Sequence, residues 1–512
     1  MISTLARSPL TVRLHATDNV VTAKTTIPAG TVLDGEKVTT TMQIPVGHKV
    51  ATRSIATGEA VIKYSQIIGF ATQAIAAGEH VHTQNVEVRA FERDYRIGED
   101  VRAVDFVPEA ERASFQGIVR DDGRVATRNF IGILTSVNCS ATVARLIADQ
   151  FKGNGLADYP NVDGVVALTH GSGCGMAGYG EGWDMLQATI AGYARHPNFA
   201  GLVMVGLGCE VNQISSMAER YDWQLGEKFH AMTIQETGGT AATVRAGVAR
   251  VKDMLPLANR VTRTKVPASE LILGLNCGGS DAYSGITANP ALGAATDLLV
   301  RHGGTSVLAE TPEIYGAEHL LTRRAVSREV AEKLIGYIHW WEDYTARNGG
   351  EMNNNPSPGN KAGGLTTILE KSLGAAAKGG TTNLTGVFQY AEPITAKGFT
   401  FMNTPGYDVT SVNGLIAGGA NIVCFTTGRG SVFGSKPAPT IKLATNTPMY
   451  KRMADDMDIN CGLILDGEAT VAEMGERIFK LVLETASGRK TKSEELGLGD
   501  EEFVPWQMGA VM

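Results

Sequence analysis

Apolar runs alternate with helical patterns from about residue 115 onward. The strand-like runs are FIGILTSV, GVVALTH, GLVMVGLG, ELILGLN, TSVLAE, FTFMNT, NIVCFTT and TIKLAT. Between some of them lie stretches with helical spacing, such as NPALGAATDLLVRHG and REVAEKLIGYIHWWEDY. Strands that alternate with helices are typical of βαβ units, so this pattern predicts an α/β region built on a parallel sheet.

The first 88 residues follow a different pattern of short alternating runs, such as KVTTTMQI and KVATRSI. Three fragments echo one another, namely IPAGT, IATGEAVIK and IAAGEHVHT. Each combines the end of a strand, a glycine turn and a new strand, so we predict an all-β domain over residues 1–88. The charged, aperiodic residues 89–113 are predicted to be a linker. A charged stretch near 250–268 divides the rest into a middle α/β domain, 114–265, and a C-terminal domain, 266–512.

Composition and charge narrow the possible functions. The 512 residues are 43% hydrophobic and 19% charged, as expected of a globular protein of several domains. A net charge of -7 argues against a nucleic-acid or anionic membrane surface. No apolar run approaches the roughly 20 residues of a membrane span, and the first residues lack the apolar core of a signal peptide. We therefore expect a cytoplasmic protein with neither a nucleic-acid nor a membrane partner.

Four of the six cysteines stand at or just past the end of a predicted strand: Cys139, Cys174, Cys209 and Cys277. His170 and Glu210 lie at strand ends too, and ligands of open α/β sheets bind beyond the carboxyl ends of the strands. This placement predicts a polar crevice that holds iron, zinc or copper, since thiolate and imidazole select these metals over magnesium and calcium. No C-x-x-C pair exists, which excludes a zinc ribbon. Plain burial of each thiol is the competing explanation.

A glycine-rich loop offers a different chemistry. Gly173, Gly175 and Gly178 form a G-x-G-x-x-G pattern between a predicted strand and a predicted helix, as in dinucleotide-binding sites. The acid at the end of the next strand, Glu210, comes about 30 residues after the glycines instead of roughly 20. A NAD-dependent oxidoreductase is therefore retained as an alternative.

Long motifs along nearly the whole chain resemble the altronate/galactarate dehydratase family, which includes sulfolactate sulfo-lyase. They are HATDNVVTA, GIVRDDGRVATRNFIGILTSVNCS, GLGCE, CGGSDAYSGITANPALG, ETPEIYGAEHLL, NPSPGNKAGGLTTILEKSLG, FTTGRGS and MDINCG. The resemblance implies an N-terminal β-clip (SAF-like) domain, a middle domain, a Rossmann-like C-terminal domain and iron-dependent dehydration of an aldonic or aldaric acid. The stretches AGEHVHTQN and IYGAE lie nearer the altronate branch. Cys424 and Cys461 stand where the family usually has other residues.

This chemistry assigns roles to the singled-out residues. Removing a proton beside a carboxylate requires a metal or another cation to stabilise the enediolate, and a second acid to help hydroxide leave. The predicted metal ligands are Cys139, Cys174, Cys209, Glu210 and Cys277, with Fe²⁺ expected, Mn²⁺ as an option and an iron–sulfur cluster left open. The predicted catalytic residues are His170, Lys361 and Lys371. The predicted substrate-binding residues are Arg128, Asn129, Ser280, Asp281, Ser284, Asn289, Asn360 and Arg429. For each residue a purely structural role competes with the functional one.

The resulting hypothesis is a metal-dependent sugar-acid dehydratase that gives a 2-keto-3-deoxy acid. D-altronate is the favoured substrate, followed by galactarate or another hexonate, and a homodimer is expected. Two alternatives remain, the NAD-dependent oxidoreductase and a sugar-acid sensor without catalytic activity.

Overall fold

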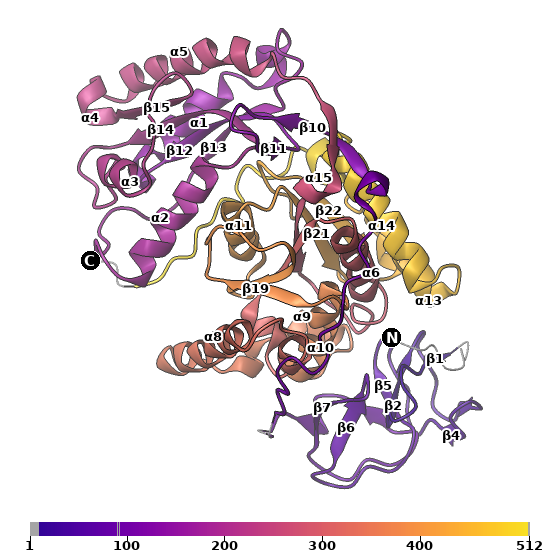
Figure 1. The fold of residues 1–512 in the computed structure, drawn as a ribbon. Coiled ribbons are helices and arrows are strands. Elements are labelled where there is room, and N and C mark those ends of the chain that lie inside the picture. Colours follow the sequence, from indigo (N-terminus) through magenta and orange to yellow (C-terminus); the bar gives the residue numbers. More distant parts are fainter. Residues whose placement is uncertain (1–9, 90, 92, 510–512) are drawn as a thin grey trace.

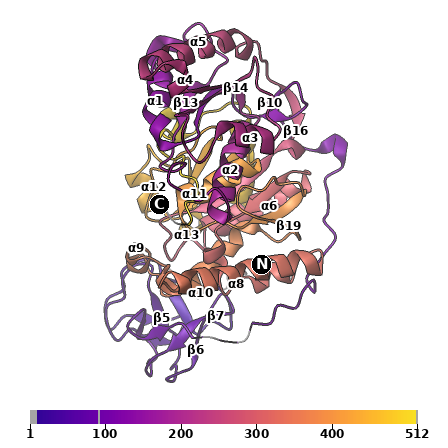
Figure 2. The ribbon, with the colours of Figure 1, turned by 90° about the vertical axis from the view of Figure 1, so that its left-hand side faces the viewer.

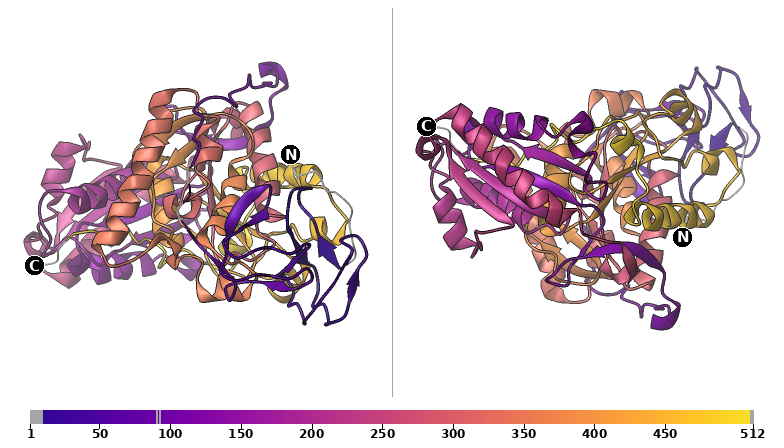
Figure 3. Two further views of the ribbon diagram at one scale, coloured as in Figure 1. Left: turned by 90° about the horizontal axis from the view of Figure 1, so that it is seen from below. Right: turned by 90° about the horizontal axis from the view of Figure 1, so that it is seen from above.

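The computed structural model describes residues 10–89, 91 and 93–509. An all-β domain and a middle α/β domain lie at opposite ends of the molecule, with a larger α/β domain between them (Figures 1 and 3). The prediction of an α/β protein with an all-β N-terminal domain is confirmed. Among the described helices, none is long and apolar enough to cross a membrane.

The β domain contains a four-stranded sheet, a three-stranded sheet and a hairpin. The first sheet has the order β1 (Thr11–Val12), β2 (Val20–Ala23), β5 (Lys49–Ala51), β8 (His80–Val81). The others are β6 (Ala60–Lys63), β7 (Gln66–Ala71), β9 (Val86–Glu87), and the hairpin β3 (Val32–Leu33), β4 (Val38–Thr39). The three echoing fragments each carry a glycine at positive φ, Gly30, Gly58 and Gly78, which explains why they share a turn.

The connecting residues up to 113 contain one 3-10 turn, Glu109–Glu111, in their described part and run along the C-terminal domain (Figure 2). The backbone N–H groups of Gly98 and Asp100 donate to Thr322 and Arg323 there. The linker is thus attached to the surface that it crosses.

The middle domain is a parallel sheet covered by helices on both faces. Its order is β13 (Gly164–Leu168), β12 (Phe130–Thr135), β14 (Phe199–Gly206), β15 (Phe229–Thr233). Its helices are α1 (Ala141–Asp149), α2 (Glu181–Ala194), α3 (Ile214–Arg220), α4 (Ile234–Thr237) and α5 (Thr240–Ala258). A small antiparallel sheet joins it to the next domain, in the order β11 (Val125–Ala126), β10 (Ser114–Val119), β16 (Thr264–Pro267).

The C-terminal domain contains a seven-stranded parallel sheet whose strands are almost entirely buried. Its order is β19 (Leu384–Phe388), β20 (Gly398–Met402), β18 (Thr305–Leu308), β17 (Ile272–Cys277), β21 (Ile422–Thr427), β22 (Thr440–Ala444), β23 (Ile459–Asn460). Its helices are α6 (Ala288–Arg301), α7 (His319–Thr322), α8 (Arg328–Arg347), α9 (Pro358–Ala362), α10 (Ile368–Ala376), α11 (Asp408–Gly418), α12 (Thr447–Arg452), α13 (Leu463–Asp466), α14 (Val471–Ala486) and α15 (Lys492–Glu495).

The β domain is fixed to the C-terminal domain through helix α10. Glu370 on α10 is fully buried and pairs with Lys49 and Lys63 of the β domain, at 2.9 Å each. Leu373 and Ala376 of the same helix belong to the apolar core of the β domain. A buried ion pair is favourable only with near-complete hydrogen bonding, and here Glu370 also accepts from Thr366. The junction between the two domains is therefore a packed interface.

Candidate active site

The strand order of the large sheet reverses beside β17. The chain passes from β17 to β18 on one side, and β21 later pairs with its other side. Ligands of open α/β sheets bind outside the carboxyl ends of the strands at such a switch point. Strand β17 ends there with Cys277, followed by Gly278 and Gly279.

Five charged or polar side chains meet beyond the ends of β17 and β18, and we call them the acid–lysine cluster: Cys277, Glu310, Glu313, Lys371 and Lys378. The Lys378 ammonium lies 2.7 Å from the Cys277 sulfur and 3.2 Å from a Glu310 oxygen. The Lys371 ammonium lies 2.5 Å from Glu313, and the Cys277 sulfur lies 3.2 Å from the other Glu313 oxygen. All five side chains are buried, so their charges interact in a medium of low polarity.

Local structure aims the two acids inward. Glu310 follows strand β18 with a φ of 68°, a left-handed conformation that is costly for a residue with a side chain, and its N–H donates to the Thr404 hydroxyl. Glu313 lies in the following 3-10 turn, Thr311–Ile314, and accepts from the Asn355 amide at 3.0 Å. Asn355 also accepts from Lys371 at 2.8 Å. The strain at Glu310 is thus held by contacts on both sides of the turn.

The two acids of the cluster have pKa values that are shifted in opposite directions. Burial raises the pKa of Glu310. Burial also acts to raise the pKa of Glu313, but the Lys371 and Lys378 ammoniums outweigh it and hold that pKa below its ordinary value. Burial, reinforced by the two acids, raises the pKa of the Cys277 thiol well above the usual range. Two carboxyl groups with opposite shifts are typical of acid–base sites.

Asp408 extends the cluster toward solvent. It is partly exposed at the first turn of α11 and packs against Gly278, where an added Cβ would lie 2.1 Å from its carboxylate oxygen. Any side chain at position 278 would therefore displace Asp408 and press on the Phe425 ring. Burial, followed by the charge of Glu313, raises the pKa of Asp408 to about 7, which suits a general base at neutral pH.

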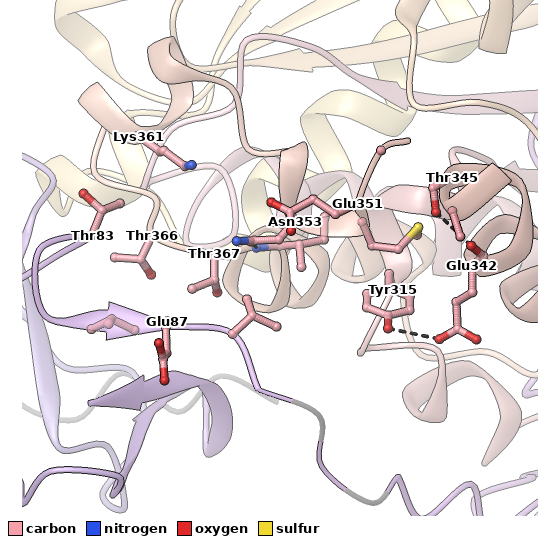
Figure 4. A pocket seen from close by; sticks show the side chains of 16 residues that line it. Thr83, Glu87, Tyr315, Glu342, Thr345, Glu351, Asn353, Lys361, Thr366 and Thr367 are labelled. Carbon is pink, nitrogen blue, oxygen red and sulfur yellow. Dashed lines mark hydrogen bonds between the residues drawn. The ribbon is translucent and has the colours of Figure 1, made fainter. Parts of the chain in front are cut away.

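A pocket of about 550 Å³ opens at the junction of the β domain and the C-terminal domain (Figure 4). Its wall includes Thr83 and Glu87 of the β domain. It also includes Tyr315 and Asn353 of the C-terminal domain, which are close in sequence to a cluster residue or to its hydrogen-bond partner. Lys361 is the one lysine or arginine of the wall, and it has no ion-pair partner among the described residues. A free ammonium in a pocket of this size can bind the carboxylate of a small acid.

Two groups of metal-ligating atoms lie within 4.8 Å of one another in the described chain: Cys277 with Glu310 and Glu313, and three histidines of the β domain. In the first group the two carboxyl groups contact the Lys371 and Lys378 ammoniums, and Lys378 also contacts the Cys277 sulfur. An ion bound at this group would have to displace these cations. The role of Cys277 as a metal ligand stays a prediction.

The other predicted cysteines lie in the middle domain, so no single crevice unites all four. Cys139, Cys174 and Cys209 are exposed in loops after β12, β13 and β14, and no group of close ligand atoms in the described chain includes them. Glu210 uses both carboxylate oxygens locally, accepting from Ser136 and from the N–H groups of Leu207 and Gly208. The Glu210 carboxylate is thus engaged within its own loop, and its role as a ligand stays a prediction.

Three predicted substrate or catalytic residues are committed to other partners. Arg128 is buried and its guanidinium binds both carboxylate oxygens of Glu494, at 2.6 and 2.8 Å, together with backbone carbonyls. Asn129 donates to the carbonyls of Asn161 and Ala258. His170 binds the Thr135 carbonyl through Nε2 and accepts from Ser172 at Nδ1, and burial lowers its pKa to about 4. None of the three reaches the acid–lysine cluster.

The predicted hydroxyl-binding residues tie loops together around the cluster. Asp281 accepts from Thr445 at 3.0 Å and from Ser284, and the Asn360 amide donates to the carbonyl of Ser280 at 2.8 Å. Asn289 bonds the Gly374 carbonyl and the Thr426 hydroxyl. These residues position the crevice, and the polar side-chain atoms of Asp281, Ser284, Asn289 and Asn360 are already paired.

Two predicted loops behave differently. Arg429 is exposed, and its backbone N–H donates to the carbonyl of Gly279. This bond does not use the guanidinium, which stays available to an anion. Gly173 of the glycine-rich loop has a φ of 97°, and an added Cβ would lie 2.3 Å from the Ser136 carbonyl. Packing between loops thus explains this glycine without a nucleotide.

Sequence reasoning assigned no role to Glu310, Glu313, Lys378 or Asp408. The acids of the ETPE stretch could have been noticed, because they follow directly after a buried strand. Nothing distinguishes Lys378 or Asp408 along the chain, since each becomes part of the cluster only through folding.

Comparison with known proteins identifies related chains along the whole length. The family model for the C-terminal domain of D-galactarate/altronate dehydratases matches residues 268–511. The second-domain model of D-galactarate dehydratase/altronate hydrolase matches residues 117–259, and the altronate/galactarate dehydratase SAF-domain model matches residues 9–89.

Curated relatives cover nearly the full chain. An altronate dehydratase of Bacillus subtilis is 35% identical over 94% of this chain and 96% of its own. A galactarate dehydratase (L-threo-forming) of Escherichia coli is 37% identical over 96% of each chain. The beta subunit of a (2R)-sulfolactate sulfo-lyase of Chromohalobacter salexigens is 30% identical over 77% of this chain and 98% of its own. All three relatives are lyases.

Proposed function

The chain belongs to the altronate/galactarate dehydratase family, and we propose that it removes water from an aldonic or aldaric acid to give a 2-keto-3-deoxy acid. Its similarity to altronate and galactarate dehydratases makes it a sugar-acid lyase. We favour D-altronate as the substrate, with galactarate or another hexonate next, and Fe²⁺ as the metal. The observation that carries this proposal is the acid–lysine cluster with the partly exposed Asp408 beside it.

The residues at this site match the needs of the reaction. Asp408, with a pKa near 7, accepts the proton from the carbon beside the carboxylate. Lys371 is charged because Glu313 raises its pKa against the effect of burial, and it gives a proton to the departing hydroxide. Loss of that proton and of hydroxide leaves an enol, which becomes the 2-keto-3-deoxy acid.

The negative charge that develops during the reaction explains why lysines lie at the site. The enediolate formed beside the substrate carboxylate is a dianion, and Lys371 and Lys378 place two positive charges near the end of β17. Lys361 in the pocket wall binds a carboxylate of the substrate. When bound, a divalent metal would add further stabilisation of the enediolate oxygens.

An anaerobic assay tests the proposal. The purified chain, supplied with Fe²⁺, is incubated with D-altronate, galactarate and other hexonates, and the 2-keto-3-deoxy product is measured. We expect turnover of at least one acid and loss of it on chelation. Turnover that requires NAD would favour the oxidoreductase, and tight binding without turnover would favour the sensor. The cytoplasmic location and the homodimer stay predictions, and sedimentation of the purified chain tests the latter.

A further inference from the structure

Three histidines of the β domain are not used by the acid–lysine cluster. His48 precedes β5, while His80 begins β8 and His82 follows it. Strands β5 and β8 pair antiparallel with Lys49 opposite Val81 and Val50 opposite His80. Residues 48 and 82 are therefore opposite each other, and alternation places all three imidazoles on one face of the sheet. Lys49 points to the other face, where it pairs with Glu370.

The imidazoles converge at the distances expected of ligands to one ion. His48 Nδ1 lies 2.9 Å from His80 Nε2, and one nitrogen from each ring lies within 4.8 Å of the others. The ring centroid of His48 is 4.4 Å from that of His82.

The surrounding contacts are compatible with an ion between the rings. His48 Nε2 lies 3.4 Å from the Ala362 carbonyl, and the 2.9 Å hydrogen bond between His48 Nδ1 and His80 Nε2 is the contact that a bound ion would replace. Metal-bound histidines usually donate their other ring N–H to such a carbonyl. His82 Nδ1 is buried and has no hydrogen-bond partner, which is costly unless something binds it.

His48 contacts the C-terminal domain, and chain neighbours of this contact and of His82 line the pocket. Gly47, directly before His48, approaches the next domain so closely that an added Cβ would lie 3.0 Å from the Gly363 carbonyl. Thr83, directly after His82, and Lys361, directly before Ala362, both belong to the pocket wall. An ion held by the β domain would thus lie beside a cavity that the other domain completes.

We propose that His48, His80 and His82 form a site for a divalent first-row transition metal at the junction of the β domain and the C-terminal domain. Imidazole selects iron, cobalt, nickel, copper and zinc over calcium and magnesium. Three protein ligands leave open positions for substrate oxygens, as in catalytic sites. That the ion takes part in dehydration rests on the proposed function, whereas the site itself rests on the geometry alone.

Cobalt binding tests the site without any assay of activity. Metal-free protein is titrated with Co²⁺ under argon, the visible absorption of bound cobalt is recorded, and bound metal is counted after dialysis. We expect one Co²⁺ per chain in the wild type. His80→Ala and His82→Ala should weaken binding by more than the roughly 10–100-fold that loss of an outer hydrogen-bond partner costs. His15→Ala is the matched control, because His15 is exposed in the same domain and, among the described residues, its ring bonds only to Thr17.

A footprint on the wild-type chain covers the case in which a variant does not fold. Diethyl pyrocarbonate modifies free imidazoles, and peptide mass spectrometry reads each position. Co²⁺ should protect His48, His80 and His82 while His15 stays reactive. Equal modification with and without cobalt would overturn the proposal, as would cobalt binding that survives in the histidine variants but disappears when Cys139, Cys174 and Cys209 are serine.

The site and the proposed function fail separately. Histidine-dependent cobalt binding in a chain that dehydrates no sugar acid would keep the site and overturn the function. Sugar-acid turnover with an unchanged iron content in His80→Ala and His82→Ala would keep the function and overturn the site.

Discussion

The two parallel sheets end in loops of similar composition, but they use those loops differently. At the middle sheet, Cys139, Cys174 and Cys209 are exposed, and the carboxylate oxygens of Glu210 are bound by its own loop. At the large sheet, the groups beyond β17 and β18 are buried and contact one another, although they come from separate segments of the C-terminal domain. Polar residues at strand ends therefore indicate the edge of a sheet at which a site can lie. The burial of these residues and their hydrogen-bond and charge partners decide whether that edge is a catalytic site.

The largest expected effect comes from Lys378→Met at the large sheet. It leaves Glu310 buried without its cation, so the free energy of unfolding should fall by about 3–5 kcal/mol. Loss of one charge aimed at the enediolate should lower kcat by about 10²–10³-fold. Denaturant melts and initial rates measure the two effects.

Lys480→Met is the control for this change, because Lys480 is exposed on α14. The double variant Lys378→Met with Glu310→Gln should be less destabilised than Lys378→Met alone, since it removes the unpaired acid as well. Unchanged stability and rate in Lys378→Met would show that the cluster is not a coupled unit.

Arg128→Ala sharpens the comparison from the middle-domain side. Its guanidinium is paired with Glu494 and carbonyls, so we expect a loss of about 1.5–3 kcal/mol of stability and an unchanged KM. Arg124→Ala, at an exposed arginine nearby, is the control. A large rise in KM without destabilisation would return Arg128 to the substrate site.

The smallest effect is expected for the exposed cysteines. Replacing Cys139, Cys174 and Cys209 together by serine should change stability by no more than about 0.5 kcal/mol, because none of them is buried. Activity should stay within about twofold of the wild type, as is usual for surface substitutions away from a site. Loss of bound iron in this triple variant would instead make the middle sheet the metal centre.

Much of the fold follows from the sequence. Hydrophobic alternation predicted the all-β domain, and eight apolar runs coincide with β12, β13, β14, β17, β18, β20, β21 and β22. Strands β15, β19 and β23 were missed, because FHAMT and LTGVF lack a strong apolar run and the last strand has two residues.

The site was less accessible to sequence reasoning. Cys277 and Lys371 were selected and do meet, since one ends a core strand and the other lies in a long motif. Lys378 resembles an ordinary solvated lysine until folding buries it against Cys277. Arg128 resembles a carboxylate clamp because its partner, Glu494, lies hundreds of residues away. Pairing between distant segments thus decides which charges are free.

The pH dependence of kcat/KM for the wild type and Asp408→Asn tests the central claim most directly. Asp408 must be ionised to act as the base, so the wild-type value should rise by about tenfold per pH unit below its pKa and level off above pH 7 or so. In Asp408→Asn this rising limb should disappear, and the rate at the plateau should fall by about 10²–10⁴-fold with the fold intact. A variant that keeps the wild-type profile and turns over within threefold or so of the wild-type rate would contradict the assignment of catalysis to the end of the large sheet.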